Sequence, residues 1–293
     1  MRGDRGFPVR LRFSKRGKVR FVSHRDLARG FERAFRISEL PLAFTEGFNP
    51  RPRVSLGLAL GVGHESDAEY LDLELAATIE LDTLAAELSE SLPVGVEVDG
   101  AVPLVPRAPA LQKAITSVGY RIRPAMEPVD VDLAVERALT ATEIPIETTR
   151  KGRPVVEDLR PGIRRLGVVD GAVEVELATQ PRGIRPAELV GALRVLAGGA
   201  RTDGEDRVLR TNQWIERDGA RREPLEADRA PRVSDDARAT SKGTPHDRGH
   251  DHPGTEPGTD PEPGPRPGER ADGTDAGASL GDPRGAVLAS RTH

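Results

Sequence analysis

An internal repeat constrains the fold of this 293-residue chain more than any other feature. The segment ERAFRISELPL at 32–42 matches ERALTATEIPI at 136–146 without a gap, at an offset of 104 residues. A second match follows in the same order, LDLELA at 71–76 against VEVELA at 173–178, at an offset of 102 residues. Because chance would rarely place two matches in the same order at nearly the same offset, the sequence predicts a duplicated unit of about one hundred residues.

The first copy opens with a strand in which Val9, Leu11 and Phe13 alternate with polar residues, so one face of that strand is basic. After a turn at KRGK, VRFV adds a short extended piece. A capping box at Ser23 and Asp26 then begins a helix that Pro41 ends. The remaining elements of the first copy are expected as strands at 42–45, 54–60 and 69–76, a helix at 82–92 and a strand near 94–104.

The second copy repeats this order of elements. It is expected to form a strand at 116–123, a helix at 130–141, strands near 144–150, 162–169 and 172–178, a helix at 186–197 and a strand at 207–215. Strand, helix, strands, helix and strand is the split βαβ order, with both helices on one face of an antiparallel sheet. The predicted fold class is α+β, with two tandem ferredoxin-like units at 7–108 and 112–216.

The last part of the chain, 219–293, is rich in proline and glycine and poor in apolar residues, so we expect a disordered tail. Its HDRGHDH segment is interpreted as mobile polar residues and not as a metal site. The chain contains no cysteine, which excludes thiolate catalysis and iron–sulfur ligation by its own residues. No apolar run reaches the length of a membrane span and the N-terminus lacks the pattern of a signal peptide, so a cytoplasmic location without a membrane partner is expected.

Charge is divided unevenly along the chain. Residues 1–60 contain fourteen Lys and Arg against five acids, whereas residues 61–110 contain eleven acids and one arginine. Such an asymmetry predicts two faces with different partners.

Four arginines share one face of the first predicted helix. Arg25, Arg29, Arg33 and Arg36 follow at spacings of four, four and three, opposite the expected buried residues Leu27 and Phe31. The structural alternative is a solvated face on which Glu32 pairs with Arg36. With the further arginines and lysines of the same block, the stripe favours a phosphate-rich ligand.

The segment TEGFNPRP follows this helix closely. Gly47 permits a sharp turn, and the two prolines stiffen the loop. Phe48 offers an aromatic face on which a base could stack, beside Asn49, with Arg51 and Arg53 for phosphates. The alternative is that Phe48 plugs the core beneath the loop. In the second copy, KGRPVVEDLRPGI at 151–163 is interpreted as a basic loop that contacts a phosphate through Lys151, Arg153 and Arg160.

Three segments, KVRFVSHRDLARGFERAF, LPLAFTEGFNPRP and GHESDAEYLDLEL, resemble the bacterial radical-SAM-linked domain of unknown function. The resemblance covers roughly 7–216, and the chain is similar to the stand-alone form of a domain otherwise fused behind radical-SAM proteins. At Gly61 and Leu56 it departs from the residues usual in that family. The resemblance implies a radical-SAM partner that carries the iron–sulfur cluster and S-adenosylmethionine, with no cofactor on this chain. It implies no established activity.

These observations lead to one main hypothesis, a non-catalytic module that binds tRNA or rRNA and acts with a radical-SAM modifying enzyme. Whether the chain has enzymatic activity of its own is left open. One alternative is a metal-independent endoribonuclease in which His24 is the base, by analogy with CRISPR RNA-processing enzymes that pair two ferredoxin-like units. Another is a protein–protein adaptor that uses the acidic region 61–99.

Overall fold

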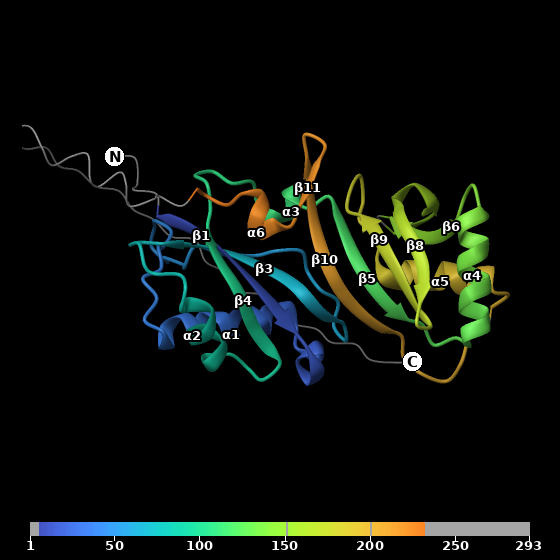
Figure 1. The fold of residues 1–293 in the computed structure, drawn as a ribbon, viewed down its shortest axis with the longest axis horizontal. Coiled ribbons are helices and arrows are strands. Elements are labelled where there is room, and N and C mark those ends of the chain that lie inside the picture. The colour runs from blue at the N-terminus through green and yellow to red at the C-terminus, as the bar shows by residue number, and fades with distance from the viewer. Residues whose placement is uncertain (1–5, 151, 200, 232–293) are drawn as a thin grey trace, which may run out of the picture. The chain divides into compact units, whose positions relative to one another are not determined.

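The computed structural model describes residues 6–150, 152–199 and 201–231. In this part, the chain is a mixed α+β protein with six α-helices, one nine-stranded sheet and one two-stranded sheet (Figure 1). The elements of the first half are β1 (Phe7–Lys15), α1 (His24–Ile37), β2 (Val54–Leu56), β3 (Glu65–Leu75), α2 (Leu84–Ser91) and β4 (Val96–Pro103). Those of the second half are β5 (Ser117–Arg123), α4 (Pro128–Thr140), β8 (Ile163–Val169), β9 (Ala172–Ala178), α5 (Pro186–Leu196) and β10 (Arg207–Arg217).

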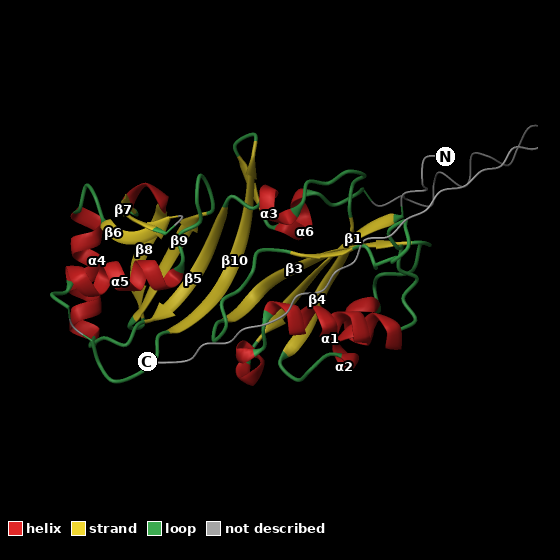
Figure 2. Ribbon diagram, turned by 180° about the vertical axis from the view of Figure 1, so that it is seen from behind, coloured by secondary structure: helices red, strands yellow, loops and turns green. Residues whose placement is uncertain are grey.

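Both halves order their strands in the same way. The sheet runs β4-β1-β3-β10-β5-β9-β8, with β2 also paired to β3, so each half places its last strand beside its first and its third strand on the other side. One apolar cluster joins α1 and α2 to β1, β3 and β4, and a second joins α4 and α5 to β5 and β9. Figure 2 shows α1 and α5 on the same side of the sheet.

The repeated sequence segments occupy corresponding places in the two halves. Residues 32–42 cover the end of α1 and the chain that leaves it, and residues 136–146 cover the end of α4 and the chain that leaves it. The segment at 71–76 ends β3 and the segment at 173–178 lies in β9, so each belongs to the third strand of its half.

The two halves meet through an unusual pair of strands. β3 and β10 are parallel and share only two residue pairs, whereas the ladders inside each half are antiparallel. Arg210 on β10 is 3% exposed and donates to the Glu69 carboxylate of β3 at 2.8 Å. It also donates to the carbonyls of Leu58 at 2.9 Å and Ala59 at 3.0 Å. One buried guanidinium therefore binds a strand and a loop of the other half.

The structured part of the chain extends beyond the boundary that composition predicts. The predicted tail begins at residue 219, but β11 (Ala220–Arg222) pairs with β10, and α6 (Pro224–Ala227) follows it. The expected boundary is therefore too early, because buried charge holds this segment where few apolar residues are present. The rest of the predicted tail, 232–293, lies outside the described residues.

Asp228 fastens this C-terminal segment to β1. The Arg10 guanidinium is 0% exposed and donates to Asp72 at 2.6 Å and to Asp228 at 3.2 Å. Burial acts to lower the pKa of Arg10, but the two carboxylates together raise it above its ordinary value. Arg217 reaches the second oxygen of Asp228 at 3.0 Å. The basic face predicted for this strand is therefore not exposed at Arg10, because the C-terminal segment covers it.

Three further local predictions differ from the structure. The VRFV segment forms the 3₁₀-helix η1 (Gly17–Phe21), since the Lys15 ammonium binds the carbonyls of Arg20 and Val22 and holds the chain in a tight turn. The strand expected at 42–45 makes only isolated bridges. The basic loop expected at 151–163 is instead the strand β7 (Arg153–Asp158), paired with β6 (Pro145–Arg150), followed by η2 (Arg160–Gly162).

Candidate nucleic-acid interface

Helix α1 forms where its capping residues and apolar spacing predict. The Ser23 hydroxyl accepts from the backbone N–H of Asp26 at 3.2 Å and donates to its carboxylate at 2.8 Å. Leu27 and Phe31 are buried, and the Phe31 ring lies 4.8 Å from that of Phe13 on β1. The helix is therefore fixed to the sheet through one face, and the opposite face is free to meet a ligand.

That opposite face carries the four predicted arginines, and all four are exposed. Arg29 pairs with Asp26 at 3.0 Å, in a contact where both side chains are more than half exposed. In the part of the chain that the structure describes, Arg25, Arg33 and Arg36 have no ion pair or side-chain hydrogen bond. The expected pairing of Glu32 with Arg36 is not formed there either. Three cations of the stripe are thus available to an anionic ligand.

The TEGFNPRP segment is the tip of a short hairpin that leaves α1. The backbone N–H of Arg53 donates to the Ala43 carbonyl at 2.9 Å, and the N–H of Thr45 donates to the Arg51 carbonyl at 2.9 Å. Gly47 turns the tip with a φ of 118°, a backbone conformation that other residues rarely adopt. The loop is therefore ordered by its backbone, and the Thr45 hydroxyl adds a bond by accepting from the backbone N–H of Arg51 at 3.0 Å.

Phe48 at this tip is 106% exposed, so it projects fully into solvent. It does not plug the core, and that alternative is excluded. Asn49 and Arg51 beside it are also exposed. A protein gains nothing in stability from an aromatic ring in water, so this ring is available for contact with another molecule.

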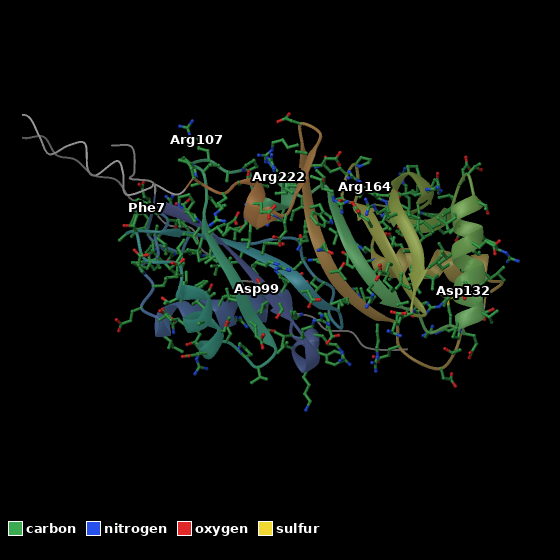
Figure 3. All side chains as sticks on the ribbon, in the orientation of Figure 1. Phe7, Asp99, Arg107, Asp132, Arg164 and Arg222 are labelled. Atoms are coloured by element: carbon green, nitrogen blue, oxygen red, sulfur yellow. The ribbon has the colours of Figure 1, made fainter. Side chains whose placement is uncertain are left out.

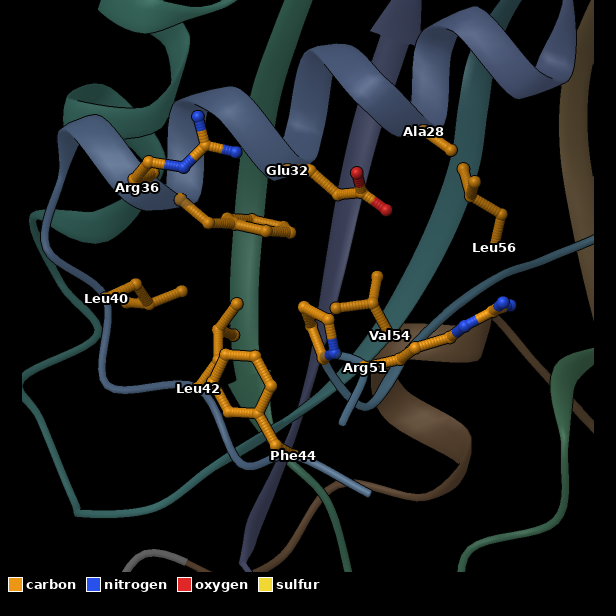
Figure 4. Close-up of a pocket in the computed structure, with 11 residues that line it drawn as sticks. Ala28, Glu32, Arg36, Leu40, Leu42, Phe44, Arg51, Val54 and Leu56 are labelled. Carbon is orange, nitrogen blue, oxygen red and sulfur yellow. The ribbon is translucent and has the colours of Figure 1, made fainter. Parts of the chain in front are cut away.

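A cleft of 720 Å³ lies between α1 and the hairpin. Apolar side chains line much of it, including Phe35 from α1 and Leu40, Leu42 and Val54 from the chain beyond it (Figure 4). Phe35 is 1% exposed and belongs to the core, so this part of the wall is rigid. The structure thus brings together the helix and the hairpin that the sequence singles out.

The polar residues of the cleft are Glu32, Arg36 and Arg51, with Phe44 beside them. In Figure 4 the Glu32 carboxylate points from α1 toward the chain that carries Val54. Phe44 is 53% exposed. Glu32 and Phe44 are missing from the predicted site; the spacing of Glu32 and Arg36, one helical turn apart, is the signal that would have included Glu32.

The other residues predicted to contact a phosphate lie in two different parts of the structure. Arg53 pairs with Glu74 at 2.9 Å and donates to the Phe44 carbonyl at 3.2 Å, so it holds the hairpin in place. Arg153 is exposed on β7, whereas Arg160 donates to the Ala141 carbonyl at 3.3 Å. Lys151 lies outside the described residues. Figures 1 and 2 place β6 and β7 at the end of the sheet opposite α1, so these residues are not part of the α1 surface.

Several other basic residues of the N-terminal block are buried or paired, so they add little to the exposed positive charge. Lys15 is 2% exposed, and burial lowers its pKa. The nearby Glu69 carboxylate partly offsets this lowering, and the Arg210 guanidinium adds to it. Arg12 pairs with Asp99 and Glu223, and Arg16 pairs with Asp67. Lys15, Arg12 and Arg16 are therefore engaged within the fold, and the exposed cations of this block include Lys18 on η1 besides those of the α1 stripe and the hairpin.

His24 is the first residue of α1 and does not line the cleft. Among the described residues, no group of three histidines, aspartates or glutamates could hold a metal ion. None of the described helices is long and apolar enough to cross a membrane.

Comparison with known proteins assigns the chain to a family. Residues 9–186 match a family described as "Uncharacterized protein conserved in bacteria (DUF2344)". No curated protein matches the chain. The matched range includes α1, the hairpin and the cleft between them, and it spans more than half of the 293 residues. The chain therefore belongs to this uncharacterized family of bacterial proteins, DUF2344.

Proposed function

We propose that this protein is a non-catalytic accessory module that binds RNA, tRNA or rRNA, through α1 and the hairpin that follows it. The exposed ring of Phe48 carries the proposal, next to Arg51, whose side chain has no ion pair with any described residue. Single-stranded RNA is bound by aromatic rings that stack on bases and by cations that track the phosphates. Arg25, Arg33 and Arg36 extend the cationic surface along the helix.

The proposed setting is a complex with a radical-SAM modifying enzyme. The resemblance of the three N-terminal segments to the radical-SAM-linked domain supports this part of the proposal. This chain has no cysteine with which to bind an iron–sulfur cluster, so the cluster and S-adenosylmethionine would belong to the partner. The role left to this chain is to bind the RNA and present it.

The proposed evolutionary origin is duplication of one ferredoxin-like unit. The common strand order of the two halves and the corresponding places of the repeated segments support it. A further correspondence is that each half inserts a hairpin between its first helix and its second strand, at 43–53 in the first and β6–β7 in the second. On this proposal the first hairpin acquired the RNA surface.

Replacing Arg25, Arg33 and Arg36 with Gln is expected to weaken binding to bulk tRNA at least about tenfold, because each neutralised phosphate releases counterions. The dependence of log affinity on log salt is expected to fall by roughly two to three. Fluorescence anisotropy at several salt concentrations measures both. The folded state should persist, since the three side chains are exposed.

The matched control replaces Arg123, Arg207 and Arg222 with Gln, which removes the same charge from exposed positions elsewhere. Arg222 lies on β11, which pairs with β10, and Figure 3 shows it away from α1. If this control weakened binding as much as the α1 variant, the affinity would come from net charge and the proposed surface would be wrong.

A further inference from the structure

The carboxylate of Glu32 is out of place on a surface that binds only phosphates. It is exposed, it lies one helical turn from Arg36, and it lines the cleft between α1 and the hairpin. No ion pair or hydrogen bond of its side chain is found with any described residue. A carboxylate there would repel a phosphate, so the part of a nucleic acid that enters the cleft beside Glu32 must be one that donates hydrogen bonds.

Among the RNA bases, guanine matches a carboxylate best. Its Watson–Crick edge presents the N1–H and the 2-amino group side by side, and two parallel donors meet the two oxygens of one carboxylate. Adenine and cytosine each place a ring acceptor beside their amino group, and uracil places its single N–H between two carbonyls. Each of these bases would set an oxygen or nitrogen lone pair against the carboxylate.

The rest of the cleft suits a base that has left the stack. Phe35, Leu42 and Val54 give it apolar walls, and the half-exposed ring of Phe44 offers a face for stacking. Arg36 and Arg51 line the same cleft and are available to the phosphates on either side of the nucleotide.

We propose that this cleft binds one unpaired guanosine of the RNA, with Glu32 accepting from N1–H and the 2-amino group. The inference rests on the proposed function and names the base that the same surface selects. Phe48 and the arginines bind neighbouring nucleotides without regard to sequence, and Glu32 provides the preference for guanosine.

The test uses three probes with the full chain: an oligouridine, the same oligomer with one central guanosine, and the same oligomer with one central inosine. Guanosine is expected to raise the affinity of the wild-type chain about tenfold, because a bidentate base contact discriminates by that amount. Inosine lacks the 2-amino group and should restore only part of the gain. In Glu32→Gln, the guanosine gain should fall to about twofold or less, while the affinity for oligouridine stays the same or rises.

Glu90→Gln is the control, because it removes an exposed carboxylate from α2, outside the cleft. It should keep the full guanosine gain. An equal affinity of wild type for the three probes, or a gain that survives in Glu32→Gln, would overturn the guanosine inference. The proposed function would still stand if the α1 arginine variant lost binding. Absence of any binding to RNA by the wild-type chain would overturn both.

Discussion

Removal of residues 219–293 lowers the thermal midpoint by roughly 6–20 °C on this account. Composition alone predicts little change in the midpoint, since this segment offers little apolar surface to a core. The structure reverses that expectation because Asp228 binds Arg10, whose side chain is 0% exposed. Loss of one partner of a buried ion pair costs about 3–5 kcal/mol. Arg10 would keep Asp72 but lose Asp228 and the Pro224 carbonyl, and Arg217 would lose Asp228 as well.

Thermal unfolding followed by circular dichroism measures this effect. Truncation after Pro231 keeps the whole described segment and should leave the midpoint nearly unchanged. Asp228→Asn in the full chain separates charge from mere chain length and should reproduce much of the loss. If truncation after Asp218 melted like the full chain, Arg10 would be satisfied without Asp228 and the anchoring role would be wrong.

Replacement of Arg210 with Met is expected to lower the free energy of unfolding by about 3–5 kcal/mol. The substitution leaves the Glu69 carboxylate buried without its cation, and it leaves the carbonyls of Leu58 and Ala59 without their donors. Because β3 and β10 share only two residue pairs, little backbone pairing is present to compensate.

Urea denaturation compares this variant with Arg121→Met, which breaks an ion pair with Glu174 on the same sheet. Both partners of that pair are more than a third exposed, so its loss should cost less than about 1 kcal/mol. The double variant Arg210→Met, Glu69→Leu should recover part of the stability, since it removes both buried charges. A cost for Arg210→Met no larger than the control would show that the two halves are held together without this contact.

The first helix was the part of the molecule that sequence predicted best. Ser23 with Asp26, and the spacing of Leu27 and Phe31, place α1 and its buried face correctly, because helix capping and amphipathic spacing act within a few residues. The repeat at 32–42 and 136–146 also predicts corresponding elements in the two halves.

Long-range pairing was beyond the reach of sequence. Arg10 and Arg12 alternate with apolar residues, and this pattern does not distinguish a polar face in water from one that meets a distant carboxylate. Only the folded chain shows that Asp228 binds Arg10. In the sequence, Arg210 likewise has no feature that distinguishes it from an exposed strand arginine, because its partner Glu69 lies 141 residues earlier. Buried charges are rare, so composition favours the exposed interpretation.

The candidate site was predicted in part. Spacing identifies the exposed arginines of α1, but the exposure of Phe48 depends on the hairpin backbone and not on its own residue type. The inclusion of Glu32 and Phe44 in one cleft with Arg51 also follows from the path of the hairpin back toward α1. A loop aromatic in sequence fits either a core anchor or a ligand contact, and only the folded chain distinguishes them.

Ultraviolet crosslinking of the full chain to the RNA that co-purifies with it from bacterial cells tests the central claim most directly. We expect RNA to be recovered and crosslinked peptides to come from α1 and from the hairpin at 43–53, with Phe48 among the modified residues. These crosslinks should be lost in the variant with Gln at positions 25, 33 and 36. Recovery of no RNA, or crosslinks confined to peptides of the second half, would contradict the assignment of this surface to RNA.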